Sequence, residues 1–186
     1  NGQAVEDKIA KFTNAYNATS IEWAPQGTKA YTDYSGKKPL LMKMFQFQIE
    51  AVGNQDLDCP EKGPLPGDVE EGKTIGTTYN GANGQVIFKN VIFEGKDVGK
   101  SYLYKITESI PTEAVNNKLN GMTYDPTVYY VKVTVGETEG TDTAAVTTTT
   151  QYLNSEMQPI PESNGFKIGR AHVRTPVTVY NLVCRL

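Results

Sequence analysis

The sequence predicts an all-β protein folded as a Greek-key, immunoglobulin-like β-sandwich. Threonine, valine and tyrosine are abundant among its 186 residues, and clusters of Gly, Asn, Asp and Pro recur between short apolar runs. The first group of residues favours strands and the second favours turns, so their repeated succession indicates many short strands. The only plausible helical stretch, Val5–Ala10, is short. A chain of this length allows one sizeable domain, or one domain with pieces of another.

The first residues have the pattern of an earlier unit that ends before a new one begins. Lys11–Tyr16 is expected to be the end of a strand and residues 17–20 a polar link, so that the new unit starts near Ile21. Thr28–Tyr31 is a short strand candidate within this unit. Met44–Glu50 then alternates with a period of two. Its inward-facing residues should be Phe45, Phe47 and Ile49.

A long polar insertion, Gly53–Lys73, follows the strand at Met44–Glu50. It contains three prolines and is longer than most connections between strands, so we expect a mobile or functional surface loop. Asn80–Gly84 then signals a turn, which leads into a strand at Gln85–Lys89.

Ser101–Glu108 is the strand with the most informative pattern. Its alternation puts both tyrosines and Ile106 on one face, and Glu108 falls on that same face. Burying a charged carboxylate costs several kcal/mol, roughly, unless the group is paired or protonated. Two interpretations follow: either the strand ends at Thr107 with Glu108 in water, or the strand carries a carboxyl group into the interior.

Three further strands complete the expected sandwich. Val128–Val135 alternates with valines on one face, Ala144–Leu153 is a threonine-rich return strand, and Gly165–Lys167 begins a final strand. Polar loops at Pro111–Gly121 and Ser155–Asn164 lie between these segments. The result is about seven strands in one Greek-key sandwich of roughly 150 residues.

Composition excludes several classes of protein. No apolar run approaches the roughly 20 residues of a transmembrane helix. No signal peptide is visible, and we take the chain to be a fragment. Cys59, Cys184 and a single histidine make neither a disulfide framework nor a metal site, and no phosphate-binding motif occurs, so no cofactor is expected. A net charge of −3 without a basic stripe argues against a nucleic-acid partner.

The carboxy-terminal residues 168–186 differ sharply in composition from the rest. All three arginines and the only histidine fall within Arg170–Leu186, which has no Asp or Glu, whereas lysine is the only strong base before it. Gly169-Arg-Ala-His-Val-Arg-Thr-Pro-Val-Thr-Val179 and the closing Leu182-Val-Cys-Arg-Leu186 resemble translated sequencing-adapter read-through. We therefore interpret residues 168–186 as an atypical tail of foreign origin.

Three segments in a fixed order resemble the isopeptide-forming pilin domains of Gram-positive bacteria. They are Thr28–Tyr31 with its lysine, Tyr102–Glu108 with the form Tyr-x-Tyr-x-Ile-x-Glu, and Gly121–Asp125 with the form Gly-x-Thr-Tyr-Asp before an alternating valine strand. This domain type occurs in streptococcal major pilins and in LPxTG-type surface adhesins, often in tandem. The resemblance covers roughly Ile21 to Lys167 and implies a sandwich of the CNA-B and pilin-like type.

The resemblance implies a self-directed reaction and no enzymatic activity on other substrates. In the family, a lysine on the first strand attacks the side-chain amide of an asparagine on the last strand, and a buried glutamic acid polarises that amide. Lys29 would then be the nucleophile and Glu108 the catalytic acid. The acceptor asparagine is expected at position 168, where this sequence has Ile168 instead, and Asn181 is the fallback acceptor.

The resemblance also divides the chain into three parts. Phe12-Thr-Asn-Ala-Tyr16 has the form of the family's last strand, Phe-x-Asn-x-Tyr, so residues 1–16 would end a preceding repeat with Asn14 as its acceptor. Residues 17–167 form the domain itself, and residues 168–186 the tail. The implied function is a structural repeat of an extracellular, cell-wall-anchored pilus subunit or adhesin stalk. Its partners would be neighbouring repeats of the same protein, with no membrane insertion.

Two other functions are consistent with a β-sandwich. One is an adhesin module that binds host matrix or glycan, which only the Gly53–Lys73 insertion favours. The other is a carbohydrate-active enzyme with Glu108 as one of two catalytic carboxylates. That enzyme needs a second inward-facing acid, and the alternation of the strands supplies none.

Overall fold

The fold is built almost entirely of strands. The structure, a computed structural model, describes residues 19–34, 36, 38–138 and 145–161, and the backbone of residues 166–173. The elements are β1 (Ile21–Trp23), β2 (Gln26–Asp33), β3 (Gln46–Val52), β4 (Ile75–Tyr79), β5 (Gln85–Ile87), β6 (Val91–Phe93), the 3-10 helix η1 (Gly95–Asp97), β7 (Ser101–Glu108), β8 (Lys118–Leu119), β9 (Met122–Thr123), β10 (Tyr129–Thr138), β11 (Ala145–Leu153) and β12 (Phe166–Val173). Among these elements, none is a helix long and apolar enough to cross a membrane. The all-β prediction is confirmed.

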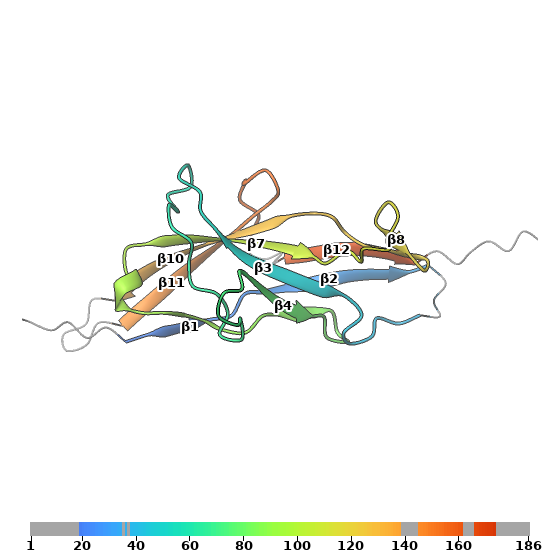
Figure 1. Cartoon of the computed structure of the whole chain (residues 1–186), viewed down its shortest axis with the longest axis horizontal. Coiled ribbons are helices and arrows are strands. Elements are labelled where there is room, and N and C mark those ends of the chain that lie inside the picture. The colour runs from blue at the N-terminus through green and yellow to red at the C-terminus, as the bar shows by residue number, and fades with distance from the viewer. Residues whose placement is uncertain (1–18, 35, 37, 139–144, 162–165, 174–186) are drawn as a thin grey trace, which may run out of the picture.

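Two five-stranded sheets make up the sandwich. One has the order β11-β10-β7-β3-β4 and the other β5-β2-β12-β9-β8, while β1 pairs with β6 alone. The pairing of β2 with β12 is parallel, whereas the other paired strands are antiparallel. Figure 1 shows β1 and β2 following one another along the long axis of the molecule. The opening segment therefore runs along the sandwich, and the last strand lies beside it.

The core lies between the sheets and consists of alternating residues. Phe45, Phe47 and Ile49 are each at most 1% exposed, which confirms the predicted inward face. The inward residues of β7 and β10 join the same cluster, together with residues at β5 and β6: Tyr102, Tyr104, Ile106, Val131, Val133, Val135, Val86, Val91 and Phe93. Burying a side chain of this size contributes about 1.5–3 kcal/mol. This cluster is the main stabilising contact between the layers.

The Gly53–Lys73 insertion is packed against β7, so the expectation of an exposed loop is wrong in part. Cys59 is fully buried and forms a second cluster with Leu103 and Leu153. On the other face of β7, the hydroxyl group of Tyr104 donates to the backbone oxygen of Pro64 at 2.8 Å. The insertion thus contacts both faces of this strand, which explains why Leu103 is buried although it points away from the main core.

Five strands went unpredicted because their sequences carry no clear alternation. Four of them, β1, β6, β8 and β9, have only two or three residues. In β4 the large apolar residues are exposed instead of buried. Ile75 and Tyr79 are 42% and 45% exposed, whereas Gly76 between them is buried. Such a strand is held by its neighbour β3 and not by an apolar face of its own.

The final strand is longer than its predicted beginning at Gly165–Lys167. β12 continues to Val173, so residues 168–173 of the atypical tail pair with β2 and, at Val173, with β9. The segments expected at Val5–Ala10 and Lys11–Tyr16 lie outside the described residues.

Gly84 allows the turn before β5 to approach β2. Its φ is +84°, and a Cβ atom there would lie 2.8 Å from the backbone oxygen of Lys29. The backbone nitrogen of Lys29 donates to the oxygen of Gly84 at 2.7 Å. The predicted turn at Asn80–Gly84 is therefore also a support for the middle of β2.

We expect Gly84→Ala to destabilise the domain more than Gly72→Ala does. Both glycines have positive φ, but nothing lies within 4 Å of a Cβ at Gly72. Each substitution should cost about 1–2 kcal/mol for the left-handed backbone, and Gly84→Ala about 1–3 kcal/mol more for the contact with β2. Urea unfolding of the two variants measures this difference. Equal losses of unfolding free energy would show that the turn does not press on β2.

Candidate functional site: a buried lysine–glutamate pair

Lys29 and Glu108 meet in the interior of the sandwich. Lys29 lies in the middle of β2, and Glu108 is the last residue of β7, in the opposite sheet. The Nζ atom of Lys29 is 2.5 Å from Oε2 of Glu108, and both side chains are 0% exposed. The interpretation in which Glu108 sits in water is therefore wrong. The pair links two sheets through residues that are 79 positions apart in the chain.

Aromatic rings surround the ammonium group of Lys29. Its Nζ atom lies 4.2 Å from the centroid of the Phe45 ring, which places a cation over a π face. The Phe45 ring in turn contacts Tyr124 edge-on at 5.7 Å and Tyr31 at 6.2 Å. These rings replace the water that would otherwise solvate the amine.

The two oxygens of the Glu108 carboxyl group have different surroundings. Oε2 accepts a hydrogen bond from Lys29 and a longer one, at 3.4 Å, from the backbone nitrogen of Asp125. The turn that presents this nitrogen is held by the backbone nitrogen of Thr127, which donates to Oδ1 of Asp125 at 2.9 Å. Oε1 is buried and has no hydrogen-bond partner within the described part of the chain. An unpartnered polar atom in such a place is costly and calls for an explanation.

Burial shifts both groups toward their neutral forms. Desolvation lowers the pKa of Lys29 and raises the pKa of Glu108, and the attraction between the two groups opposes each shift without cancelling it. The site therefore favours a neutral amine beside a protonated carboxyl group far more than water would. That combination can act as a nucleophile and an acid at the same place.

Asn80 supports the site, and the sequence reasoning missed this role. Its side chain is 1% exposed, and its Oδ1 accepts from the backbone nitrogen of Phe45 at 2.7 Å. Its Nδ2 donates to the backbone oxygen of Leu41 at 2.8 Å. Asn80 thereby fixes the segment that brings the Phe45 ring to Lys29. The only signal in the sequence was the turn at Asn80–Gly84, which did not reveal an inward side chain.

The residue next to Lys29 on the neighbouring strand is Ile168. In the parallel pairing of β12 with β2, Phe166 pairs with Gly27 and Ile168 pairs with Lys29. The backbone of the last strand therefore brings position 168 beside the lysine. The two other candidate acceptors, Asn14 and Asn181, lie outside the described residues.

A comparison with protein families matches most of the chain. The family model of the Spy0128-like isopeptide-containing domain, FctA, matches residues 25–162. The chain belongs to this family. The matched region includes Lys29 and Glu108, as well as the turn at Asn80–Gly84. Among curated proteins, no match was found.

Solved structures of the major pilin from Streptococcus pyogenes also match this isopeptide-domain chain. A glutamate-to-alanine mutant of that pilin aligns at 20% identity with a TM-score of 0.47, and the pilin itself at 18% identity with a TM-score of 0.44. Each alignment covers 81% of this chain and 50% of the pilin. The chain thus spans about half the length of the pilin structures it matches.

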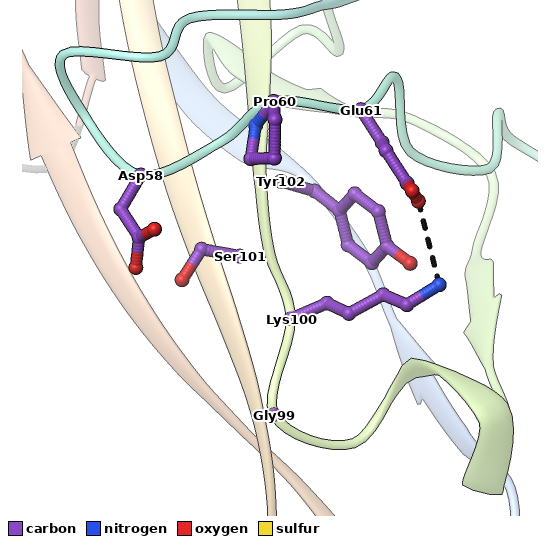
Figure 2. Close-up of a pocket in the computed structure, with 7 residues that line it drawn as sticks. All are labelled: Asp58, Pro60, Glu61, Gly99, Lys100, Ser101 and Tyr102. Carbon is purple, nitrogen blue, oxygen red and sulfur yellow. Dashed lines mark hydrogen bonds and ion pairs between the residues drawn. The ribbon is translucent and has the colours of Figure 1, made fainter.

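A hollow lies between the Gly53–Lys73 insertion and the start of β7. It measures about 150 Å³ and is lined by Asp58, Pro60, Glu61, Gly99, Lys100, Ser101 and Tyr102. Figure 2 shows Glu61 and Lys100 facing one another there, with a separation of 3.4 Å between Lys100 Nζ and Glu61 Oε2. Nearby, the hydroxyl group of Tyr102 donates to the buried Asp97 at 2.7 Å. No cluster of three or more metal-binding side chains exists in the residues that the structure describes.

Lys29→Met should make the stability of the domain depend on pH. In the parent, the Lys29–Glu108 pair holds one titratable proton, which sits on either Lys29 or Glu108. The same two side chains also hold one such proton in the unfolded chain between pH 5 and 8. The pair therefore adds no pH dependence to the free energy of unfolding in this range. Removing Lys29 removes the attraction that lowers the pKa of Glu108, and burial then raises that pKa further above its unfolded value. A raised folded pKa gives stability that is present below the unfolded pKa and is lost as pH rises through the folded one.

The variant is therefore expected to lose about 3–5 kcal/mol of unfolding free energy at pH 8 and less than that at pH 5. Urea unfolding at the two pH values measures it. The control is Lys29→Met combined with Glu108→Gln, which removes both titrating groups and should lose the same amount at both values. A loss in Lys29→Met that did not change with pH would contradict the buried acid.

Proposed function

We propose that the chain is a load-bearing repeat of a cell-surface pilus subunit or adhesin stalk. Its domain is of a type that is cross-linked by an intramolecular bond between Lys29 and an asparagine of the last strand. The observation that carries this proposal is the Lys29–Glu108 pair, 2.5 Å apart and fully buried among aromatic rings. Membership of the isopeptide-domain family supports the same conclusion.

The geometry supports a reaction in which Lys29 is the nucleophile and Glu108 the acid. A neutral Lys29 amine attacks the side-chain carbonyl carbon of an asparagine at position 168. Protonated Glu108, through Oε1, donates to the carbonyl oxygen and stabilises the negative charge that develops on it. A new C–N bond forms, the bond to the original amide nitrogen breaks, and that nitrogen leaves as ammonia with a proton taken from the amine. Because the fold holds all three groups together, the step is effectively unimolecular.

A bond at this place would resist mechanical force. β2 and β12 are the first and last strands of their sheet in chain order, and they are parallel neighbours. Tension applied at the two ends of the domain would therefore act on the pairing of these strands, which is a ladder of backbone hydrogen bonds. A covalent bond between them would carry the tension directly.

In this chain the acceptor position holds a residue that cannot react. The side chain of isoleucine has no electrophilic carbon, so Ile168 leaves Lys29 and Glu108 as an unreacted couple. An ion pair or a shared proton is then the least costly state of the two groups. We therefore infer that the chain keeps the reactive half of the site without the bond.

The same proposal assigns the surroundings of the domain. Residues 1–16 would belong to a preceding repeat with Asn14 as its acceptor, and neighbouring repeats of the same protein on the bacterial cell wall would be its partners. The alternative of a ligand-binding adhesin module has less support, because part of the Gly53–Lys73 insertion packs against β7.

Ile168→Asn should restore the bond. The purified variant is expected to have the calculated mass minus one ammonia, whereas the parent should have its full mass. Peptide mapping should find Lys29 joined to residue 168. Adding Lys29→Ala or Glu108→Gln to Ile168→Asn should abolish the loss of ammonia.

Two results would count against this assignment. An Ile168→Asn variant that folds but keeps its full mass would show that Lys29 and Glu108 are not a reactive pair. A parent chain that already lacks one ammonia, and regains it in Asn181→Ala, would identify Asn181 as the true acceptor.

A further inference from the structure

The two hydrogen bonds to Oε2 of Glu108 leave Oε1 as the oxygen that can carry a proton. Nζ of Lys29 donates to Oε2 at 2.5 Å, and the backbone nitrogen of Asp125 donates to the same oxygen at 3.4 Å. Oε1 is buried and has no partner among the described residues. A protonated carboxyl group has one O–H donor, and its other oxygen remains an acceptor. With both donors at Oε2, the proton of a neutral Glu108 belongs on Oε1.

The position of this proton controls whether Lys29 can attack. A proton on Oε2 would be directed at Nζ, 2.5 Å away, and would occupy the lone pair of the neutral amine. With the proton on Oε1, Lys29 donates one of its own N–H bonds to Oε2, and its lone pair stays available. The O–H group on Oε1 can then donate to the amide oxygen of an acceptor. Only the second of these two arrangements is reactive.

The backbone N–H of Asp125 favours the reactive arrangement. The hydroxyl oxygen of a carboxylic acid accepts hydrogen bonds less well than the carbonyl oxygen does, so a second donor at Oε2 favours the form with the proton on Oε1. We propose that Asp125 is a positioning residue for the cross-linking reaction, because its turn holds this N–H against Glu108 and keeps the acidic proton on Oε1. This inference rests on the proposed function, since it concerns the same reaction.

The side chain of Asp125 holds its own backbone nitrogen in place. Oδ1 of Asp125 accepts from the backbone nitrogen of Thr127 at 2.9 Å and also from the Thr127 hydroxyl group. An aspartate that bonds to the backbone two residues later closes an Asx turn. On the other side, Tyr124 is 6% exposed, and its ring packs edge-on against Phe45, which covers Lys29. The turn is thus fixed both by the aromatic rings of the site and by Thr127.

The charge of Asp125 acts on Glu108 in the opposite direction from its backbone N–H. Among the described residues, the titratable groups that face Glu108 are Lys29, Asp125 and Tyr124. Burial is the main cause of the raised pKa of Glu108, and the attraction of Lys29 opposes it. The negative charge of Asp125 raises this pKa as well, whereas the hydrogen bond from its backbone nitrogen lowers it. An experiment must therefore separate the charge from the turn.

Asp125→Asn and Asp125→Ala separate the two effects. Both substitutions remove the charge, but only asparagine keeps an oxygen to which Thr127 can donate. The test measures the rate of ammonia loss in the full chain carrying Ile168→Asn together with either substitution. Each protein is purified in urea from inclusion bodies so that it starts unreacted, and it is then folded by dilution. Intact mass is measured at timed intervals.

The variant without the turn should react more slowly than its charge-matched partner. We expect Asp125→Ala to lose ammonia roughly 3–10-fold more slowly than Asp125→Asn, which corresponds to the loss of one ordinary hydrogen bond. The control is Asn154→Ala. Oδ1 of Asn154 closes a similar turn by accepting from the backbone nitrogens of Glu156 and Gln158, both at 2.9 Å, after a strand that β10 separates from β7. Asn154→Ala should leave the rate unchanged.

A second measurement does not depend on the reaction. In the Lys29→Met chain, the pKa of Glu108 should be higher with Asp125→Ala than with Asp125→Asn, because a loosened N–H no longer stabilises the carboxylate. An NMR titration of the side-chain carboxyl carbon of Glu108 measures this difference. If Asp125→Ala does not fold, Thr127→Val takes its place and Thr127→Ser becomes its partner, with the same order of rates and of pKa values expected.

The outcomes distinguish this inference from the proposed function. If Ile168→Asn loses ammonia and the two Asp125 variants react at equal rates, the role of the turn is wrong and the proposed function stands. The role of the turn is also wrong if Asn154→Ala slows the reaction as much as Asp125→Ala does, or if the pKa of Glu108 is the same in both Asp125 variants. If Ile168→Asn folds but keeps its full mass, both the inference and the proposed function are wrong.

Discussion

The desolvation of Lys29 and Glu108 is the constraint on which the rest of the site depends. Two ionisable side chains with no exposure to solvent cannot both remain charged and unpaired, so each must face the other or become neutral. The fold meets this requirement by bringing β2 and the end of β7 together from opposite sheets. Phe45 covers the amine, and Asn80 and Gly84 hold the neighbouring segments in place.

Stability alone does not account for such a pair. Replacing a buried ion pair with well-packed apolar residues is often neutral or stabilising, and an interior lined by Phe45, Tyr124 and Ile106 could have accepted them. Oε1 of Glu108, which has no partner among the residues that the structure describes, makes the arrangement still less favourable as a purely structural contact. The features that are costly for folding are those that a reaction needs: an amine whose pKa is lowered and an acid whose pKa is raised. The site is therefore better understood as chemistry held in a stable sandwich than as part of what stabilises it.

Much of the fold, and part of the candidate site, could be predicted from the sequence. The reason is that period-two alternation marks a strand that is buried on one face. It placed Glu108 on the same face as Tyr102 and Tyr104, although it left open whether the strand buried the carboxyl group, and it assigned the inner faces of β3 and β10. It could not predict the burial of Leu103, which depends on a distant segment around Cys59, nor the short strands β1 and β6, which are too brief to alternate. The partner of Glu108 came from the resemblance to a family and not from pattern, since no local rule relates residues 79 positions apart. Asn80 was missed for a similar reason: a turn motif predicts backbone shape but not which side chain points inward.

The pairing of the first and last strands separates folding from reactivity. β12 takes its place beside β2 through backbone hydrogen bonds, which any residue except proline can make, so Ile168 is compatible with the ladder. The reaction, by contrast, depends on the side chain at that one position. A chain can therefore keep the sandwich, the buried pair and the aromatic rings while the acceptor is absent. Such a site contains Lys29 and Glu108 but lacks an asparagine on the last strand. Under the proposed function, the residue at position 168 would then decide, more than the surroundings of the lysine, whether a bond is made.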